Sequence, residues 1–482
     1  MRTVAFAVHA MRGRLLGPSQ PDAAFAGAAF DSRLVRPGEM FFALPGENVD
    51  GYDYCSAATA RGAVALVVDI RRGLPAGLRG PDGGSAAVPV IGVDDPLAAL
   101  ANLARAIRAD FSGRVIGITG SNGKTTTREL TAAALGAAGR VLETRGNYNT
   151  EIGLPLTIIG ASGDEEFWVL EMAMRGRGQI ALLADIARPH VGVITNVAGA
   201  HLGLLGSIEE IARAKGELFA ALREGGIAVL PGGDALIEAQ AAHLPDSRKV
   251  RFEGVGRAPA SGLDVVILES LSAGVAGQVV RYAVRRQPVV ARLPLAGLHN
   301  ARNGAAALAV AAALQLPIPD AARALSRTVL PPHRSLPITV AGRIILDDCY
   351  NANPDSMRAA LGALFESTAR FGGRAFAILG DMLEIGPDAR ELHRELGREA
   401  GVRLAGLGVL GDLGAQIAIG ARAVGLDATR VVCDADPKAV AAAVASWARP
   451  GDWILVKASR GMRLERAIDS LVEEFRKQTP IA

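Results

Sequence analysis

Residues 114–127 read RVIGITGSNGKTTT, and this stretch decides the fold. Its opening apolar run, which includes Val115, Ile116 and Ile118, predicts a buried strand. A glycine-rich turn follows, and then Lys124 and three threonines open a helical segment. Backbone N–H groups, a helix N-terminus and one lysine form an anion site in such a turn, and a threonine hydroxyl is available to Mg²⁺. The stretch therefore predicts a nucleotide phosphate loop.

The match is not to the strict form of the motif, because position 118, where its first glycine would fall, holds Ile. An ordinary glycine turn before a helix is the alternative, but Gly-Lys-Thr directly after a strand favours a phosphate loop. We expect the nucleotide to contact the loop residues Gly120, Ser121, Asn122, Gly123, Lys124, Thr125 and Thr126.

Length and composition predict a globular protein of two to four domains. The chain has 482 residues, of which half are hydrophobic and 21% charged. A net charge of +3 gives no reason to expect nucleic acid or an anionic membrane as partner. We read neither a signal peptide nor a membrane span. The three cysteines are scattered, which favours a reducing, cytoplasmic location.

Arginine is the usual cation of this chain. The only lysines are Lys124, Lys215, Lys249, Lys438, Lys457 and Lys477. A lysine inside a motif therefore suggests a task that a guanidinium group cannot perform.

The sequence divides into three expected α/β domains. Residues 1–95 contain three apolar strands and form a small α/β unit. Residues 96–332 carry the phosphate loop and form the central ATPase-like sheet. The pattern breaks at Leu330-Pro331-Pro332, and residues 333–482 read as a Rossmann-like open sheet. That last sheet has no phosphate loop, so we expect it to close over a nucleotide held by the central domain.

Several polar residues of the central domain suggest a metal site. The apolar run 167–170 ends in Glu171, where a carboxylate at a strand end can hold Mg²⁺. A second strand leads to His201, which on its own is more often structural. Ser207 and Glu210 have capping-box spacing and begin a helix that carries Lys215. Lys215 is either a surface residue or a carbamylated lysine that joins Glu171 and His201 around a second Mg²⁺.

Other polar clusters leave two interpretations open. Asn147, Asn149 and Thr150 are either a ligand-facing loop or a turn. Asn300 and Asn303 share a helix face and suit adenine, although helix capping also explains Asn300.

Two polar segments outside the central domain also have alternatives. Asp31, Ser32 and Arg33 suit a nucleotide or phosphate, or form a turn with a solvated charge pair. In the third domain a strand at 344–346 leads to a polar loop with a helix cap at Asp355 or Ser356. An aspartate after that strand suits ribose hydroxyls.

Together these segments resemble the Mur ligases of peptidoglycan synthesis. The resemblance rests on TGSNGKTTT, the Glu171 strand end, His201, AKGE at 214–217, GLHNARN, and DDCYNANPDSM with GDMLEIG, and it extends over essentially the whole chain. YNANPDS and GDMLEIG are typical of the members that add D-alanyl-D-alanine. The Asp-Tyr-Ala-His and Asn-Pro-Arg motifs of the members that add the third amino acid are not found.

The resemblance implies an ATP-dependent ligase, which we expect to be a monomer, that joins D-alanyl-D-alanine to UDP-N-acetylmuramoyl-tripeptide through an acyl phosphate. It implies that Lys124 and Thr125 hold the ATP phosphates and a first Mg²⁺, that Glu171 is shared between metals, and that His201 and carbamylated Lys215 hold a second Mg²⁺. Asn303 would contact adenine, Arg334 the γ-phosphate and Asp348 the ribose. The substrates would meet Asp31, Ser32 and Arg33 at the uridine, Asn147, Asn149 and Thr150 at the pyrophosphate or sugar, and Tyr350, Asn351 and Asn353 at the dipeptide.

Two positions depart from the family pattern. PPHRS around Arg334 replaces the usual Pro-Gly-Arg, and Tyr52 stands where histidine is common. Another Mur ligase or a folylpolyglutamate-type ligase would share the central domain, and a switch or motor ATPase would share the phosphate loop. The sequence does not distinguish diaminopimelate from lysine at the third peptide position.

Overall fold

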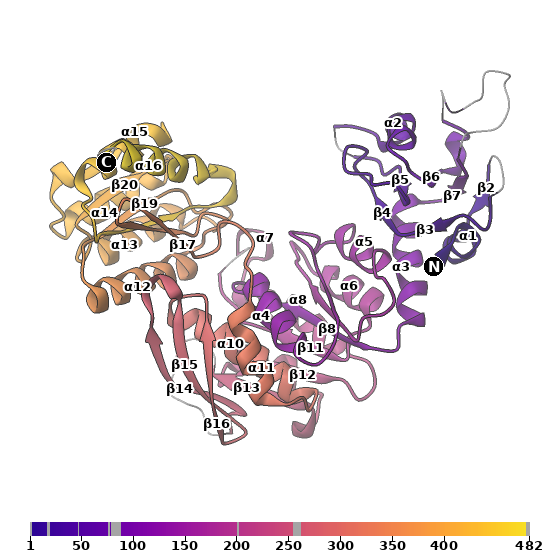
Figure 1. Cartoon of the computed structure of the whole chain (residues 1–482), viewed down its shortest axis with the longest axis horizontal. Helices are drawn as coiled ribbons and strands as arrows, with labels where there is room; N and C mark the ends of the chain where they lie inside the picture. Colours follow the sequence, from indigo (N-terminus) through magenta and orange to yellow (C-terminus); the bar gives the residue numbers. More distant parts are fainter. Residues whose placement is uncertain are drawn as a thin grey trace.

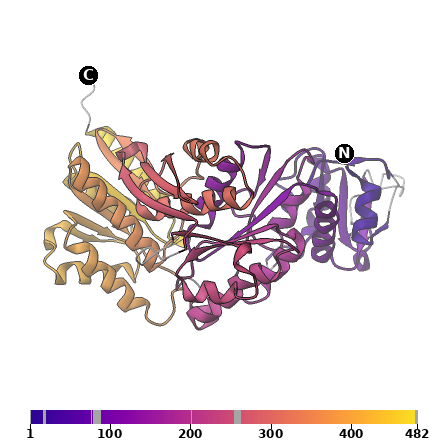
Figure 2. The same cartoon turned by 90° about the horizontal axis from the view of Figure 1, so that it is seen from below.

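The computed structural model describes residues 2–16, 20–46, 48–75, 78, 88–199, 202–253 and 262–478. Its strands form three large sheets and a two-stranded ribbon, and the large sheets carry helices on their faces. Figures 1 and 2 show the N-terminal and C-terminal sheets at opposite ends of the central one. This arrangement confirms the expected α/β class with three units. None of the helices in the described residues combines the length and apolar character needed to cross a bilayer.

The central sheet contains the phosphate loop. Its strands are β8 (Arg114–Thr119), β9 (Val141–Glu143), β10 (Phe167–Glu171), β11 (Val191–Ile194), β12 (Ile227–Gly232), β13 (Lys249–Glu253), β14 (Val265–Ser272), β15 (Gln278–Val284) and β16 (Gln287–Leu293). Within the described chain the order is β16-β15-β14-β13-β12-β11-β8-β10-β9. Pairing is parallel from β9 to β14, and β14, β15 and β16 form an antiparallel meander.

Helices cover both faces of the central sheet because successive side chains point to opposite faces and the strands are apolar almost throughout. The helices are α3 (Pro96–Asp110), α4 (Lys124–Leu135), α5 (Gly153–Ile159), α6 (Gln179–Ala187), α7 (Leu202–Leu205), α8 (Ile208–Ala220), α9 (Ala235–Gln240), α10 (Leu298–Ala313) and α11 (Ile318–Ala324). Val115 of β8 packs with α3, α5, α6 and α8, whereas Ile116 and Ile118 pack with α4, α10 and α11. This two-sided burial is typical of parallel sheets.

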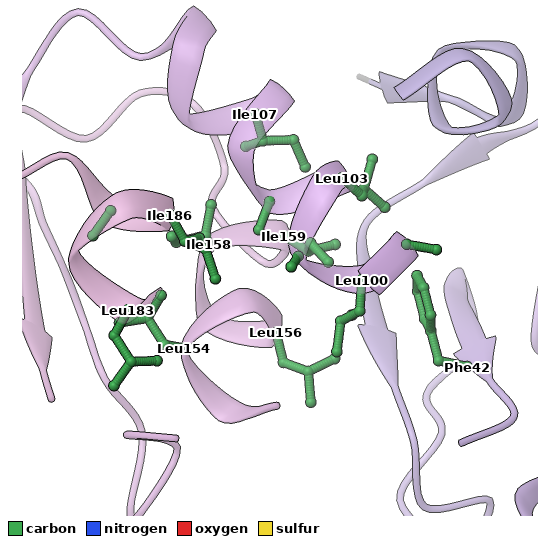
Figure 3. Packing of buried hydrophobic residues seen from close by; sticks show 14 of the residues in the cluster. Phe42, Leu100, Leu103, Ile107, Leu154, Leu156, Ile158, Ile159, Leu183 and Ile186 are labelled. Carbon is green, nitrogen blue, oxygen red and sulfur yellow. The ribbon is translucent and has the colours of Figure 1, made fainter. Parts of the chain in front are cut away.

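The N-terminal sheet shares a core with the central unit. It consists of β2 (Arg14–Leu15), β4 (Gly27–Ala29), β5 (Glu39–Phe42), β6 (Ala65–Asp69) and β7 (Val90–Val93), with α1 (Val4–Met11) and α2 (Cys55–Ala60) beside it. Figure 3 shows Phe42 of β5 next to Leu100 of α3, and the same cluster continues to Ile158 of α5 and Ile186 of α6. Burial of each such side chain stabilises the folded state by about 1.5–3 kcal/mol. The N-terminal unit is therefore packed onto the central one through α3.

The C-terminal sheet is a second, mostly parallel sheet. Its strands are β17 (Leu336–Val340), β18 (Arg343–Asp347), β19 (Ala375–Leu379), β20 (Gly406–Val409), β21 (Val431–Cys433) and β22 (Trp453–Lys457), in the order β17-β18-β22-β19-β20-β21. Helices α12 (Pro354–Phe371), α13 (Ala389–Gly401) and α14 (Gly414–Ala423) pack on one face, and α15 (Pro437–Trp447) and α16 (Glu465–Lys477) on the other. Only the edge strand β17 pairs antiparallel.

Local details differ from the sequence-based expectations at two helix ends. The cap of α12 is Asn353, not Asp355 or Ser356, because its side chain accepts from the Ser356 N–H while the Ser356 hydroxyl accepts from the Asn353 N–H. The segment TRELTAAALGAAG predicts a helix that stops at Gly139, whereas α4 ends four residues earlier, at Leu135. The expected cap of α8 is confirmed, since Ser207 accepts a hydrogen bond from the Glu210 N–H.

His190 connects three segments of the central unit. Its Nδ1 accepts from the Val115 N–H at 3.0 Å, and Arg223 Nη1 lies 2.7 Å from its Nε2. Burial and the charges of Arg223, Arg108 and Arg114 lower the pKa of His190 to about 4. The folded protein therefore holds this ring neutral.

This pKa predicts a loss of stability in mild acid. Below pH about 6.5 the imidazole binds a proton in the unfolded chain, whereas His190 in the folded protein stays neutral until the pH approaches 4. The free energy of unfolding therefore falls by about 2 kcal/mol between pH above 6.5 and pH about 5. Thermal unfolding at these two pH values should show a larger decline for the wild type than for His190→Asn, which keeps an acceptor but cannot titrate. Equal declines would contradict this role.

Candidate functional site

The carboxyl ends of strands from two sheets face one cavity of about 1180 Å³. From the central sheet it is lined by the loop after β8, by Glu171 at the end of β10, and by Asn196 after β11. From the C-terminal sheet it is lined by Asp348 after β18 and by Lys457 at the end of β22. Strand carboxyl ends are where open α/β sheets bind ligands.

The cavity brings together most of the expected site residues. Those that line it are Ser121, Asn122, Gly123, Lys124, Thr125, Thr126, Asn149, Glu171, Asn300, Asn303, Arg334, Asp348, Tyr350, Asn351 and Asn353. Gly120, Asn147, Thr150 and Lys215 belong to the neighbouring segments without lining it. His201 lies outside the described residues.

The phosphate loop has a backbone that other side chains hold in place. Gly123 precedes α4 with φ 78°, and the Cβ of any other residue there would lie 2.5 Å from Asn303 Oδ1. The Asn122 N–H donates to Asn196 Oδ1, and the Asn122 carbonyl accepts from Thr195 Oγ1 and Asn196 Nδ2. The loop is thus fixed by the residues that follow β11.

Lys124 lies over this loop. Its Nζ donates to the carbonyl oxygen atoms of Gly120 at 2.8 Å and Ser121 at 3.4 Å. Burial lowers the pKa of Lys124; the Glu171 carboxylate opposes this shift and the Arg334 guanidinium adds to it. The charges of Lys124, Arg334 and Glu171 therefore interact at the loop.

One carboxylate oxygen of Glu171 accepts no hydrogen bond from the described residues. Its Oε1 accepts from Asn149 Nδ2 at 2.8 Å, whereas its buried Oε2 has no hydrogen-bond partner and lies 3.6 Å from Arg128 Nη1. Thr125, at the start of α4, is buried next to the same cavity. A carboxylate oxygen and a threonine hydroxyl beside a phosphate loop fit the oxygen ligands that Mg²⁺ prefers.

Arg128 links Glu171 to two further acids. Its guanidinium lies near Glu143 and Glu129 and donates to the Gly146 carbonyl. Burial and the charge of Glu129 raise the pKa of Glu143 to about 7, against the influence of Arg128. Arg128 therefore counters negative charge behind the phosphate site.

Lys215 is enclosed on α8. Its residue is 2% exposed, and burial together with the positive charge of Lys124 lowers its pKa well below the usual 10.5. The amine is therefore driven toward the neutral form, which is the form that reacts with CO₂. A surface position for Lys215, the alternative left open by its sequence, is excluded.

Asn300 and Asn303 bond to each other and to nearby groups. Asn303 Nδ2 donates to Asn300 Oδ1, and Asn303 Oδ1 accepts from the Thr127 hydroxyl at 3.3 Å. Asn300 Nδ2 donates to the Ala296 carbonyl. Asn303 thus connects α10 to the phosphate-loop helix.

The segment before β17 is tied to the loop after β18. His333, at φ 67°, places its Nδ1 2.9 Å from Asp347, and the Tyr350 N–H donates to the His333 carbonyl. Arg334 lies over the Tyr350 ring at 3.9 Å. The positive charge of Arg334 contributes to the lowered pKa of Lys124, and both side chains line the cavity at the phosphate loop.

His333, Asp347 and Cys349 are a second group that could hold a metal ion. Their ligand atoms lie within 4.8 Å of one another. However, the imidazole and the thiol both already bond to Asp347, and burial raises the pKa of Cys349, which favours the neutral thiol. We therefore regard this group as a tether between segments.

Asp348 is held by three hydrogen bonds. Lys457 Nζ donates to its Oδ2 at 2.6 Å, and the N–H and hydroxyl of Ser335 donate to its Oδ1. Lys457 also donates to the Asn351 carbonyl. The polar loop expected after this strand is thus anchored by a buried lysine.

The remaining expected substrate residues lie apart from the cavity. Asp31, Ser32 and Arg33 follow β4 in the N-terminal sheet, where Arg33 pairs with Asp31 at 2.7 Å and Ser32 is buried. The Asp31–Arg33 ion pair agrees with the second interpretation of this segment, a turn with a solvated charge pair. The Asn147 carbonyl accepts a hydrogen bond from the Asn149 N–H, and the Asn149 side chain connects that loop to Glu171.

Sequence reasoning missed three residues of the site. Asn196 fixes the loop and directly follows a strand, the same signal that identified Glu171. Lys457 is one of six lysines and ends a strand, so composition could have found it. Arg128 gave no signal, because one arginine among many becomes distinctive only through its burial.

Three family models match the chain. The Mur ligase middle domain matches residues 118–311, the Mur ligase glutamate ligase domain matches residues 333–460, and the Mur ligase family catalytic domain matches residues 25–108.

Relatives and solved structures agree with these models. A UDP-N-acetylmuramoyl-tripeptide--D-alanyl-D-alanine ligase of Bacillus subtilis is 36% identical over 474 residues, covering 98% of each chain. The structure of MurF from Acinetobacter baumannii matches with a TM-score of 0.83 and 27% identity, covering 98% of each chain. MurF ligase from Thermotoga maritima in complex with ADP matches with a TM-score of 0.78 and 29% identity, covering 95% of this chain and 99% of that one.

The glycine geometry predicts that Gly123→Ala weakens ADP binding by about tenfold or more, because its φ of 78° strains other residues and its Cβ would meet Asn303. Gly176→Ala is the matched control, since no atom lies within 4 Å of its added Cβ. Isothermal titration with Mg·ADP measures both. Equal affinities for the two variants would refute the assigned loop geometry.

Proposed function

This chain belongs to the Mur ligase family, and we propose that it joins D-alanyl-D-alanine to UDP-N-acetylmuramoyl-tripeptide while converting ATP to ADP and phosphate. The product is the UDP-linked pentapeptide of peptidoglycan precursor synthesis. The observation that carries this proposal is a phosphate loop facing a second α/β sheet across one polar cavity, in a chain whose full-length relatives are named for this reaction.

The chemistry follows from the poor reactivity of a carboxylate toward amines. Transfer of the γ-phosphoryl group of ATP to the terminal carboxylate of the tripeptide forms an acyl phosphate and ADP. The free amine of D-alanyl-D-alanine then attacks the acyl carbon, the C–O bond to phosphate breaks, and the amine loses a proton. Water would hydrolyse the acyl phosphate, so a site enclosed between two domains protects it.

The phosphate end of ATP is assigned to the loop and its cations. The N–H groups of the loop and the ammonium of Lys124 bind the phosphates, and Arg334, supported on Tyr350, approaches the γ-phosphate. Thr125 and Glu171 would hold Mg²⁺, which supplies positive charge against the phosphoryl oxygen atoms. Asp348, fixed by Lys457, is assigned to the ribose and Asn303 to the adenine side.

The second metal site is assigned to Glu171, His201 and Lys215. The low pKa of Lys215 supports carbamylation, because the neutral amine adds CO₂ and releases a proton to become an anionic ligand. The carbamate would also relieve the repulsion between Lys215 and Lys124.

Substrate recognition is assigned to both outer units. Ser32 and the Asp31–Arg33 pair of the N-terminal sheet are placed at the uridine, with Asn147, Asn149 and Thr150 along the pyrophosphate or sugar. Tyr350 and Asn351 are placed near the dipeptide. We expect a cytoplasmic monomer, in keeping with three cysteines that form no disulfide.

The ligation proposal predicts which substrates release phosphate from ATP. Release should require both a UDP-tripeptide and D-alanyl-D-alanine, since an amine is needed to turn the acyl phosphate over. Coupled phosphate assays with each tripeptide, ending in lysine or diaminopimelate, measure this requirement and identify the preferred peptide. Steady phosphate release from ATP alone would instead indicate a switch or motor ATPase.

Lys215 provides a sharper test of the metal site. Lys215→Arg keeps a long basic side chain but cannot form a carbamate, so we expect a loss of turnover of about 100-fold or more. Lys438→Arg, the same substitution at an exposed position of α15, should turn over normally. In parallel, protein equilibrated with ¹³C-bicarbonate should give a carbamate NMR signal in the wild type and none in Lys215→Arg. A fully active Lys215→Arg enzyme would rule out the carbamate.

A further inference from the structure

One side-chain hydrogen bond crosses the cavity from the C-terminal unit to the phosphate loop. Asn353 Nδ2 donates to Asn122 Oδ1 at 2.6 Å, across a separation of 231 residues in sequence. Asn353 is 7% exposed and Asn122 is half-buried, so the bond is partly buried at the cavity wall. Both side chains line the cavity, and the bond lies directly beside the loop that binds phosphate.

Asn353 uses both ends of its amide. Its Oδ1 caps α12 by accepting from the Ser356 N–H at 2.9 Å, and the Asn353 N–H donates to the Ser356 hydroxyl at 3.0 Å. Only Nδ2 remains, and it is the group that reaches Asn122. The cap therefore fixes the rotamer that presents the donor to the phosphate loop.

Asn122 does not need its side chain to hold the loop. Its N–H and carbonyl are bonded to Asn196 and Thr195. Within the described residues, the bond from Asn353 is the one hydrogen bond found for its side chain. The Asn122 side chain is thus the part of the loop that faces the other unit.

Backbone contacts elsewhere set the two units close together. A Cβ built on Gly297, at the start of α10, would lie 2.9 Å from Ala363 of α12. A Cβ on Gly203 of α7 would lie 3.4 Å from Gly386 Cα. These two contacts join glycine and alanine, which have no polar side chains. The Asn122–Asn353 hydrogen bond is directional, so it depends on the position of the loop.

We propose that Asn353 is a positioning residue that couples docking of the C-terminal unit to the geometry of the phosphate loop. This inference rests on the proposed function. When α12 docks, the amide of Asn353 holds the Asn122 side chain, and this contact from the C-terminal unit adds to the backbone bonds by which Thr195 and Asn196 hold the loop. The sequence instead suggested that Asn353 faces the dipeptide, and the two roles make different kinetic predictions.

Serine and alanine substitutions separate the cap from the crossing bond. Asn353→Ser keeps a good helix cap but is too short to reach Asn122, whereas Asn353→Ala loses both. Asn122→Ala removes the bond from the other side. We expect each of the three variants to lower kcat about fivefold, with the KM for D-alanyl-D-alanine nearly unchanged. Only Asn353→Ala should lower the Tm.

Two controls make the test specific. The double variant Asn122→Ala/Asn353→Ser should be no slower than either single variant, because both remove the same bond. Asp436→Ala removes the cap of α15, another helix with proline at its first position, and should lower the Tm without lowering kcat.

Three outcomes would overturn the inference while wild-type ligation stays intact. Full rescue of kcat by Asn353→Ser would mean that the cap alone matters. A rise in the KM for the dipeptide at unchanged kcat would mean direct substrate contact. Additive losses in the double variant would mean that the two asparagines act separately. Failure of the wild type to ligate would instead refute the proposed function.

Discussion

The structure depends on one constraint, which is that the turn after β8 keeps its shape at the cavity without a regular secondary structure to hold it. Glycine makes the turn possible, and Thr195 and Asn196 from the neighbouring strand end satisfy the polar groups of the turn. The parallel order of β8, β10 and β11 is what brings those side chains to the same edge. The cations, the carboxylate and the docking helix α12 are all positioned relative to this turn.

Charge balance around the turn follows from burial. At the loop itself, Lys124 and Arg334 place positive charge beside the buried acid Glu171, whereas Arg128 behind the loop is balanced by Glu129, Glu143 and Glu171. Such a site is suited to a ligand with several negative charges. The second α/β sheet then supplies what the central sheet lacks, namely a polar surface that covers the reacting groups and reaches the loop through α12.

Much of this was predictable, because the signals were local. The strand, loop and helix at 114–127, Glu171 at a strand end and the capping box at Ser207 follow from residue periodicity and capping chemistry. Contacts between distant segments were not predictable from one sequence. The bond from Asn353 to Asn122, the clamp of Lys457 on Asp348 and the burial of Arg128 depend on how the sheets pack. Burial also distinguished the two interpretations of Lys215, which spacing alone had left open.

The most direct test of the account concerns where the transferred phosphoryl group goes. The enzyme would be given UDP-tripeptide labelled with ¹⁸O in its terminal carboxylate, together with ATP and D-alanyl-D-alanine, and the released phosphate analysed by mass spectrometry. Formation of an acyl phosphate requires one carboxylate oxygen to leave with the phosphate, so the released phosphate should carry ¹⁸O. Phosphate without the label would contradict it.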